Sequence, residues 1–249
     1  MCGIIDVKFL EVCFFMIYVT SDLHGRFDCL KRLLDAAKFS DSDWLYIIGD
    51  VIDRNGDGGV SILKWLLVQP NVELLLGNHE GFLLANEWLF DEITEDSLDA
   101  LHPRNLSSLS TWKRNGATPT IEALRQEDPE TRADLLDYVK DCPLYDSVSV
   151  EGRDFLLVHG GLGNYRPDKK IGEYTESELL WERPILTTRY SDDFTTLIGH
   201  TPTHFYGSEY RGRILTTDTW INIDTGAACG MTPCLLRLDD MREFYWNEG

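Results

Sequence analysis

Three consecutive segments of the chain repeat one order, in which a short apolar run is followed by a polar cluster. The apolar runs cover residues 17–20, 45–48 and 72–76, and each has the length and composition of a buried strand. Amphipathic stretches at 27–38 and 60–68 separate them and read as helices. Because strands and helices alternate, the sequence predicts an α/β fold with parallel strands, whose polar clusters gather at one edge of the sheet.

The rest of the chain departs from this alternation. Residues 81–145 read as a helical insertion, which we expect to cap the sheet edge and to bring Trp112–Gly116 toward it. The final third is strand-rich, with a hairpin expected at 147–158. Helices are expected at 81–90, 120–125 and 129–141, and further strands at 194–198, 220–223, 235–238 and 243–246.

The chain of 249 residues is 43% hydrophobic and carries a net charge of −19, from 23 basic and 42 acidic side chains. Such an excess of negative charge disfavours nonspecific binding to nucleic acid or to an anionic membrane. The six cysteines form no Cys-x-x-Cys pattern, so we expect free thiols. Because of its charge, the protein is expected to have no nucleic-acid or membrane partner. The free thiols agree with a predicted cytoplasmic location.

The beginning of the chain is apolar, but Glu11 interrupts residues 9–19 and no basic region precedes them. This stretch is too short for a membrane span and lacks the flanks of a signal peptide. Since the first strand can start at Met16, we interpret residues 1–15 as an extension from an upstream start codon. Residues 16–249 are then a single domain with a helical cap insertion at about 81–145.

The polar clusters after the predicted strands contain oxygen and nitrogen donors and no thiolate. This donor set suits Mn²⁺, Fe or Zn²⁺ better than copper or an iron–sulfur cluster. Each cluster alone has a simpler interpretation, such as a satisfied core histidine or a turn with a surface ion pair. The conjunction at successive strand ends favours a metal site. The residues concerned are Asp22, His24, Asp50, Asp53, Arg54, Asn78, His79, His159 and His200.

Five motifs together resemble the signature of calcineurin-like metallophosphoesterases, and more narrowly that of the small bacterial and phage-type phosphoprotein phosphatases. They are Asp-Leu-His-Gly at 22–25, Gly-Asp-Val-Ile-Asp-Arg at 49–54, Gly-Asn-His-Glu at 77–80, His-Gly-Gly at 159–161 and Gly-His at 199–200. The resemblance runs from residue 17 to residue 238. It implies a sandwich of two mixed β-sheets flanked by helices, with the insertion as a cap.

The resemblance also implies a centre of two divalent metal ions, with Mn²⁺ expected and Fe or Zn²⁺ as alternatives. Asp50 would be shared between both ions, and a hydroxide bridging them would attack phosphorus directly. One ion would be held by Asp22, His24 and Asp50, and the other by Asp50, Asn78, His159 and His200.

By the same resemblance, His79 would protonate the leaving group and Asp53 would orient its imidazole. Arg54 would bind the phosphoryl oxygens, together with Asn78. The segment Leu-Leu-Trp-Glu-Arg-Pro at 179–184 resembles the one that carries a second phosphate-binding arginine, which makes Arg183 a candidate. Its alternative interpretation is a surface arginine beside a buried tryptophan.

Three residues depart from the family pattern. Ser21 and Asn55 stand where glycine is usual, and asparagine tolerates left-handed backbone angles better than most residues. Leu76 stands where phosphoprotein phosphatases often have arginine, which removes a positive charge and weakens the case for a protein substrate.

The sequence therefore predicts a metal-dependent phosphatase that hydrolyses phosphoserine and phosphothreonine, or small phosphate esters more broadly. The alternative is hydrolysis of diadenosine tetraphosphate, which Leu76 favours. A second alternative is a catalytically silent relative that only binds.

Overall fold

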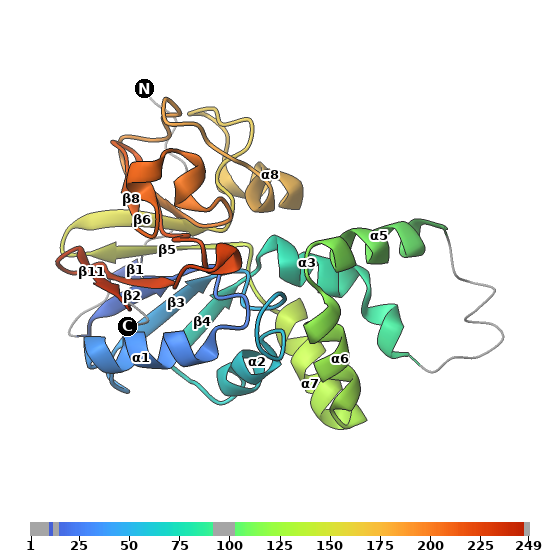
Figure 1. The fold of residues 1–249 in the computed structure, drawn as a ribbon. Helices are drawn as coiled ribbons and strands as arrows, with labels where there is room; N and C mark the ends of the chain where they lie inside the picture. The colour runs from blue at the N-terminus through green and yellow to red at the C-terminus, as the bar shows by residue number, and fades with distance from the viewer. Residues whose placement is uncertain (1–9, 12–14, 92–102, 247–249) are drawn as a thin grey trace.

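The computed structural model describes residues 10–11, 15–91 and 103–246, and it places them in two β-sheets packed face to face with helices outside (Figure 1). This is the predicted α/β sandwich of two mixed sheets flanked by helices. In the described part of the chain, no helix combines the length and the apolar character needed to cross a membrane.

The first sheet has five strands in the order β11-β10-β2-β3-β4. Strands β2, β3 and β4 are parallel, and β10 pairs antiparallel with both β2 and β11. The parallel part is the predicted alternation, because helix α1 (Phe27–Ala37) joins β2 to β3 and helix α2 (Val60–Leu66) joins β3 to β4. The strands are β2 (Ile17–Thr20), β3 (Trp44–Ile48), β4 (Val72–Leu75), β10 (Cys234–Arg237) and β11 (Arg242–Tyr245).

The second sheet has six strands in the order β1-β5-β6-β7-β9-β8. Strands β5 and β6 form the predicted hairpin, and β6, β7 and β9 run parallel to one another. The edge strands β1 and β8 were not expected from the sequence. The strands are β1 (Leu10–Glu11), β5 (Tyr145–Val150), β6 (Arg153–Val158), β7 (Thr195–Ile198), β8 (Leu215–Thr216) and β9 (Trp220–Asn222).

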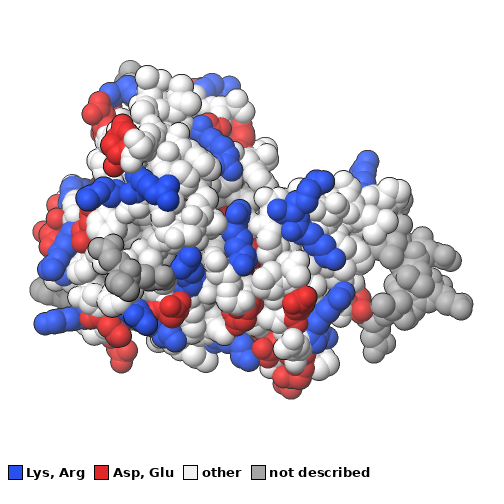
Figure 2. All heavy atoms as spheres, in the orientation of Figure 1, with Lys and Arg blue, Asp and Glu red and all other residues white. Residues whose placement is uncertain are grey.

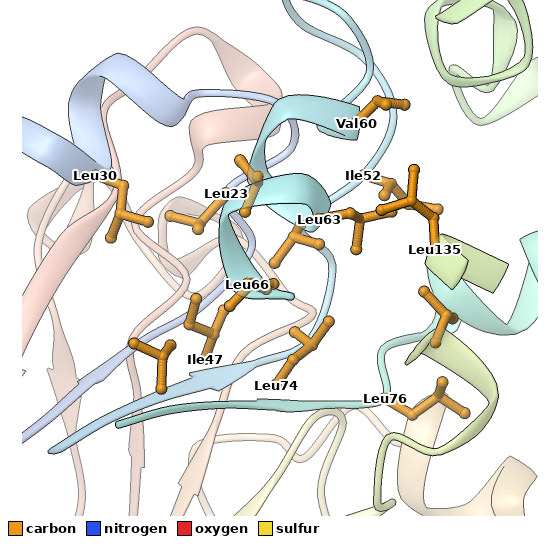
Figure 3. Close-up of a cluster of buried hydrophobic side chains, with 14 of the residues drawn as sticks. Leu23, Leu30, Ile47, Ile52, Val60, Leu63, Leu66, Leu74, Leu76 and Leu135 are labelled. Carbon is orange, nitrogen blue, oxygen red and sulfur yellow. The ribbon is translucent and has the colours of Figure 1, made fainter. Parts of the chain in front are cut away.

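The core is divided by the alternation of side chains along the central strands. Ile17, Val19 and Ile48 face the second sheet, in a cluster with Phe155 and Leu197. The intervening residues of the same strands face the opposite way and pack under α1 and α2 (Figure 3). The first sheet is therefore buried on both faces, which explains why its strands read as nearly continuous apolar runs.

The segment expected as a cap forms an arm of helices beside the sandwich (Figure 1). Helix α5 was missed as an element, because its apolar positions are few and its pattern is mostly polar. The predicted helix at 81–90 is split, so that α3 starts at the polar motif itself and a 3₁₀ turn follows it. The elements are α3 (Asn78–Ala85), η1 (Glu87–Phe90), α5 (Pro103–Arg114), α6 (Thr118–Gln126) and α7 (Pro129–Lys140).

Short helical turns surround the ends of the second sheet. They are η2 (Ile171–Glu173), α8 (Glu176–Leu180), η3 (Thr203–Phe205), η4 (Ser208–Tyr210) and η5 (Ala227–Cys229). The four cysteines in the described ranges are all free thiols, as expected.

The N-terminal residues expected to be an extension lie mostly outside the described residues. Leu10 and Glu11 pair in parallel with Val148 and Ser149 of β5, at the edge of the second sheet. A chain starting at Met16 would lose this edge pairing and keep every buried residue of the three core clusters, so retention of activity by that chain stays a prediction.

Candidate metal centre

The ends of five strands bring the predicted ligands to one place. Asp22 and His24 follow β2, and Asp50 follows β3 two residues beyond its end. Asn78 begins helix α3 just after β4, while His159 follows β6 and His200 comes two residues after β7. All these side chains are buried. The site therefore joins the carboxyl ends of parallel strands from both sheets.

Asp50 lies at the centre of this group, with a histidine on each side. Its Oδ2 is 3.7 Å from Nε2 of His24, and its Oδ1 is 3.4 Å from Nε2 of His159. Oδ1 also accepts a hydrogen bond of 2.9 Å from the backbone N–H of His79, which fixes the carboxylate plane. The two oxygens of one carboxylate thus face two separate sets of donors.

The two sets differ in how closely they match the expected ligands. Ligand atoms of Asp50, His159 and His200 lie within 4.8 Å of one another, as do those of His24, Asp50 and His79. Asp22, expected in the first set, has its Oδ1 3.9 Å from Nε2 of His24. Its Oδ2 accepts hydrogen bonds from Ser21 Oγ and from the backbone N–H of His200. Asn78 Oδ1 lies 2.9 Å from Nε2 of His159, beside the second set.

The histidines are oriented as metal-binding imidazoles usually are. Nδ1 of His24 is 2.9 Å from the carbonyl oxygen of Ile52, and Nδ1 of His159 is 2.9 Å from that of Ile48. A proton on each Nδ1 leaves a lone pair on each Nε2, close to Asp50 for His24 and close to both Asp50 and Asn78 for His159. Nε2 of His200 is buried and has no hydrogen-bond partner in the part of the chain that the structure describes. An orphaned buried acceptor of this kind fits a metal ligand.

Charge at the site points to the same conclusion. Burial raises the pKa of Asp22, and burial together with the neighbouring carboxylates of Asp22 and Glu80 raises the pKa of Asp50 well above its ordinary value. Burial also lowers the pKa of His24 and of His200. Buried carboxylates that repel one another, next to neutral imidazoles, need a cation to be stable in the ionised form. The donor set therefore fits divalent metal ions.

The backbone at the site is strained. Non-glycine residues with positive φ are uncommon, because the Cβ atom crowds the following carbonyl. Such residues concentrate here, and the strain points to a functional site. The site residues with positive φ are Asp22 (51°), His24 (44°), Asp50 (56°), Asp53 (74°), Arg54 (73°) and His200 (66°).

The glycines of two motifs are required by close approach. A Cβ on Gly77 would lie 2.3 Å from Oδ1 of Asp50, and a Cβ on Gly49 would lie 2.7 Å from Nδ1 of His159. Any side chain at these positions would therefore displace a predicted ligand.

His79 stands at the edge of this group, in a hydrogen-bonded chain that reaches the helical arm. Its Nδ1 is 2.5 Å from Oδ2 of Asp53, so the carboxylate holds the Nδ1–H tautomer and leaves Nε2 facing the pocket. Asp53 also accepts hydrogen bonds from Trp112 Nε1 (2.7 Å) and from Thr120 Oγ1 (2.5 Å). Burial raises the pKa of Asp53 to about 7 despite these bonds, and burial lowers the pKa of His79.

Glu80 holds the loop that follows β3, which carries Asp50, through hydrogen bonds to its backbone. The sequence analysis gave this residue no role of its own. Its Oε2 accepts hydrogen bonds from the backbone N–H of Asp50 (2.7 Å) and of Gly77 (3.0 Å). Its Oε1 accepts from the N–H of Val51 (2.9 Å) and of Ile52 (3.3 Å). One buried carboxylate thus ties the loop after β3 to the loop after β4.

Two arginines line the pocket that opens above the ligands. Nη2 of Arg54 is 3.3 Å from Nε2 of His79, and the backbone N–H of Arg54 donates to the carbonyl oxygen of Gly116 in the helical arm. Nη1 of Arg183 donates to Thr201 Oγ1 at 2.8 Å. The pocket has a volume of about 150 Å³, and basic side chains border the hollow between α8 and α5 (Figure 2). Both arginines predicted to bind phosphate are thus placed beside the ligands.

A model of the calcineurin-like phosphoesterase family matches residues 15–222. The chain belongs to this family. The match includes all five motifs. Metallophosphoesterases use a dinuclear metal centre, which agrees with the two donor sets around Asp50. The narrower assignment to phosphoprotein phosphatases is not established by this match.

Curated relatives of this phosphoesterase are symmetrical bis(5'-nucleosyl)-tetraphosphatases. The protein from Chromobacterium violaceum is 27% identical over 197 residues, which cover 76% of this chain and 57% of the relative. The protein from Actinobacillus pleuropneumoniae is also 27% identical over 197 residues, covering 78% of this chain and 62% of the relative. The matched region thus spans less than two thirds of the length of these relatives.

Solved structures share the fold of this phosphoesterase. A protein described as a candidate diadenosine tetraphosphatase superposes with a TM-score of 0.60 at 17% identity, covering 97% of this chain and 98% of that one. A serine/threonine phosphatase from Saccharomyces cerevisiae superposes with a TM-score of 0.58 at 15% identity, covering 94% and 81%. At these identities the comparison concerns the fold alone.

The residues that depart from the family pattern have local explanations. Asn55 does not have positive φ, because the left-handed angles fall on Asp53 and Arg54 instead. The Asn55 side chain donates to the carbonyl of His24 at 2.9 Å. Leu76 is buried in the core cluster that contains Leu135 of α7 (Figure 3), away from the pocket.

Proposed function

We propose that this phosphoesterase hydrolyses dinucleoside tetraphosphates in a metal-dependent reaction. Asp50 carries the proposal, because its two oxygens face separate donor sets at 3.4 Å and 3.7 Å. Asp22 and His24 would complete one metal site, and Asn78, His159 and His200 the other, with Mn²⁺ expected. When bound, two divalent cations would neutralise phosphoryl charge and activate a water molecule.

In the proposed reaction, the protein's own groups bind and orient the phosphate. Arg54 and Arg183 line the pocket beside the ligands and present N–H donors to phosphoryl oxygens. Asn78 would add an amide donor. His79 would hold a proton at Nε2 for the departing oxygen, and Asp53 would stabilise the imidazolium through Nδ1.

The names of the curated relatives support the dinucleotide substrate, at 27% identity. A second candidate is hydrolysis of phosphoserine and phosphothreonine, and the pair of His79 and Asp53 favours it. A serine alkoxide is a poor leaving group that needs a proton, whereas a nucleoside diphosphate leaves as a stable anion. Hydrolysis of a phosphoprotein therefore depends more on an oriented general acid than hydrolysis of a dinucleoside tetraphosphate does.

A single panel tests these candidates. The Mn²⁺-loaded protein should release nucleoside diphosphate from diadenosine tetraphosphate with a higher kcat/KM than it shows for a phosphoserine peptide. The reverse order would favour the phosphoprotein reaction. If the protein bound two metal ions per chain and hydrolysed neither substrate nor p-nitrophenyl phosphate, it would be the silent binding relative and the proposed function would be wrong.

A further inference from the structure

A second cavity of about 520 Å³ lies outside the metal centre and has the size of a ligand pocket. Its walls are the loop 211–213 before β8, the turn 230–232 before β10, and Tyr245 at the end of β11 with Trp246 after it. These segments come from the edges of both sheets. The pocket is therefore built by the sandwich itself and not by the helical arm.

Two arginines in this pocket lack partners. Arg211 and Arg213 are exposed, and neither guanidinium has a hydrogen bond or an ion pair with any residue in the described ranges. In a chain with a net charge of −19, acidic side chains to pair with are abundant. Two unpaired guanidinium groups on the wall of one cavity provide a binding site for an anion with several oxygens, such as a phosphate chain.

Two aromatic residues line the same pocket. Trp246 and Tyr245 line the pocket, and the guanidinium of Arg32 stacks on the Trp246 ring at 4.9 Å. Hydrogen bonds hold these walls in place: Thr232 Oγ1 donates to the Trp246 carbonyl, and Ile214 N donates to the Tyr245 hydroxyl at 3.0 Å. Aromatic side chains held in place beside guanidinium groups match a ligand that joins a planar base to phosphates.

The second pocket adjoins the metal pocket, which is the cavity of about 150 Å³ lined by Asp22, His24 and Asp50, through one turn of the chain. Ala228 and Cys229 line the metal pocket, and the next residues, Gly230 and Met231, line the second pocket. Consecutive Cα atoms are about 3.8 Å apart, so the two cavities share this turn as a wall. Phe205 also lines the metal pocket and is 67% exposed, which leaves an apolar surface next to the turn.

We propose that the second pocket binds the distal nucleotide of a dinucleoside tetraphosphate whose scissile phosphate lies at the metal centre. Arg211 and Arg213 bind phosphate oxygens of that nucleotide, and the aromatic wall contacts its base. The inference rests on the proposed function, and it explains how one chain would select a long substrate with a nucleoside at both ends. A free nucleotide that regulates the enzyme has the same chemistry, and the experiment separates the two.

The test compares the Mn²⁺-loaded protein with the Arg211→Gln/Arg213→Gln double variant. For diadenosine tetraphosphate, KM should rise at least about tenfold, since each lost arginine–phosphate bond contributes about a factor of ten. For p-nitrophenyl phosphate, which is too small to reach the second pocket, kcat/KM should stay within about twofold. The control is Arg104→Gln/Arg125→Gln on α5 and α6, which removes the same charge and should leave both values unchanged.

Two results would overturn the inference. An unchanged KM for diadenosine tetraphosphate in the double variant would exclude the substrate role. This holds even if the pocket binds free ADP, because such binding would then be that of a regulator. An equal loss with both substrates would place the arginines in support of the metal pocket instead.

Calorimetric titration with ADP provides a readout that does not need turnover. ADP should bind the wild-type protein and bind the double variant at least about tenfold more weakly. If the protein hydrolyses no ester, the proposed function fails and this titration alone decides whether the pocket binds nucleotides. Equal ADP affinity in both proteins would then contradict the pocket as well.

Discussion

Glu80 is the residue whose replacement tests the architecture of the site most sharply. Its carboxylate accepts four backbone N–H groups, two on each oxygen, and no acceptor is bonded to either oxygen among the described residues. A protonated carboxyl would therefore have no partner for its own hydrogen. We infer that Glu80 is ionised, although burial raises its pKa.

The Glu80→Gln variant keeps the size of the side chain and replaces one oxygen by an NH₂ group. The two backbone N–H groups that donate to that oxygen in the wild-type protein would then face the N–H groups of the amide, and both hydrogen bonds would be lost. A hydrogen bond to a charged group contributes about 1.5–3 kcal/mol, so the free energy of unfolding should fall by about 3–6 kcal/mol. That is a large part of the about 5–15 kcal/mol by which domains are stable.

Urea unfolding monitored by tryptophan fluorescence measures this change. The matched control is Glu127→Gln, which breaks the surface pair with Lys64 at 2.9 Å and should cost less than about 1 kcal/mol. The Mn²⁺ affinity of Glu80→Gln should fall as well, because the loop that holds Asp50 loses its support. A loss of stability no larger than that of the control would refute the reasoning and show that Glu80 is neutral.

Three further substitutions test the metal ligands and the proton donor. His79→Asn should lower kcat on an alkyl phosphate by about 10²–10⁴-fold with both metal ions still bound, and full activity would contradict the general-acid role. Asp50→Asn should contain less bound metal while its circular dichroism spectrum stays that of the folded protein. Normal metal content would exclude a bridging role. Trp112→Phe removes the Nε1 donor to Asp53 and should lower kcat at least about tenfold with little change in metal content, as expected for a loosened imidazole; unchanged kcat would show that Thr120 alone holds Asp53.

Much of the fold was predictable because local pattern and global fold agree. Each central strand ends in a polar motif, so the motifs marked both the strand ends and the site. The strands β1 and β8 were not predictable, because each has two residues and owes its structure to its neighbour in the sheet. Helix α5 was missed because Trp112 is its only residue that is fully buried, which leaves almost no apolar periodicity to detect.

The candidate site was predictable to the extent that its residues lie in contiguous motifs. Every residue expected at the site lies in the metal pocket or bonds to a residue that does. Glu80 was within a motif, yet its role depends on a loop thirty positions earlier. Trp112 and Thr120 lie 59 and 67 positions from Asp53. Such long-range hydrogen bonds leave no periodic trace in a single sequence.

The left-handed backbone angles at the site have a consequence for protein engineering. At Asp50, Asp53 and Arg54 the residue with the lowest backbone energy is glycine, by about 1 kcal/mol at each position. A search that ranks variants by melting temperature alone would therefore be drawn toward glycine at Arg54, whereas at Asp53 the lost hydrogen bonds to His79, Trp112 and Thr120 outweigh the backbone gain. Thermostable variants of this protein should be sought on the helices, with the loop after β3 held constant.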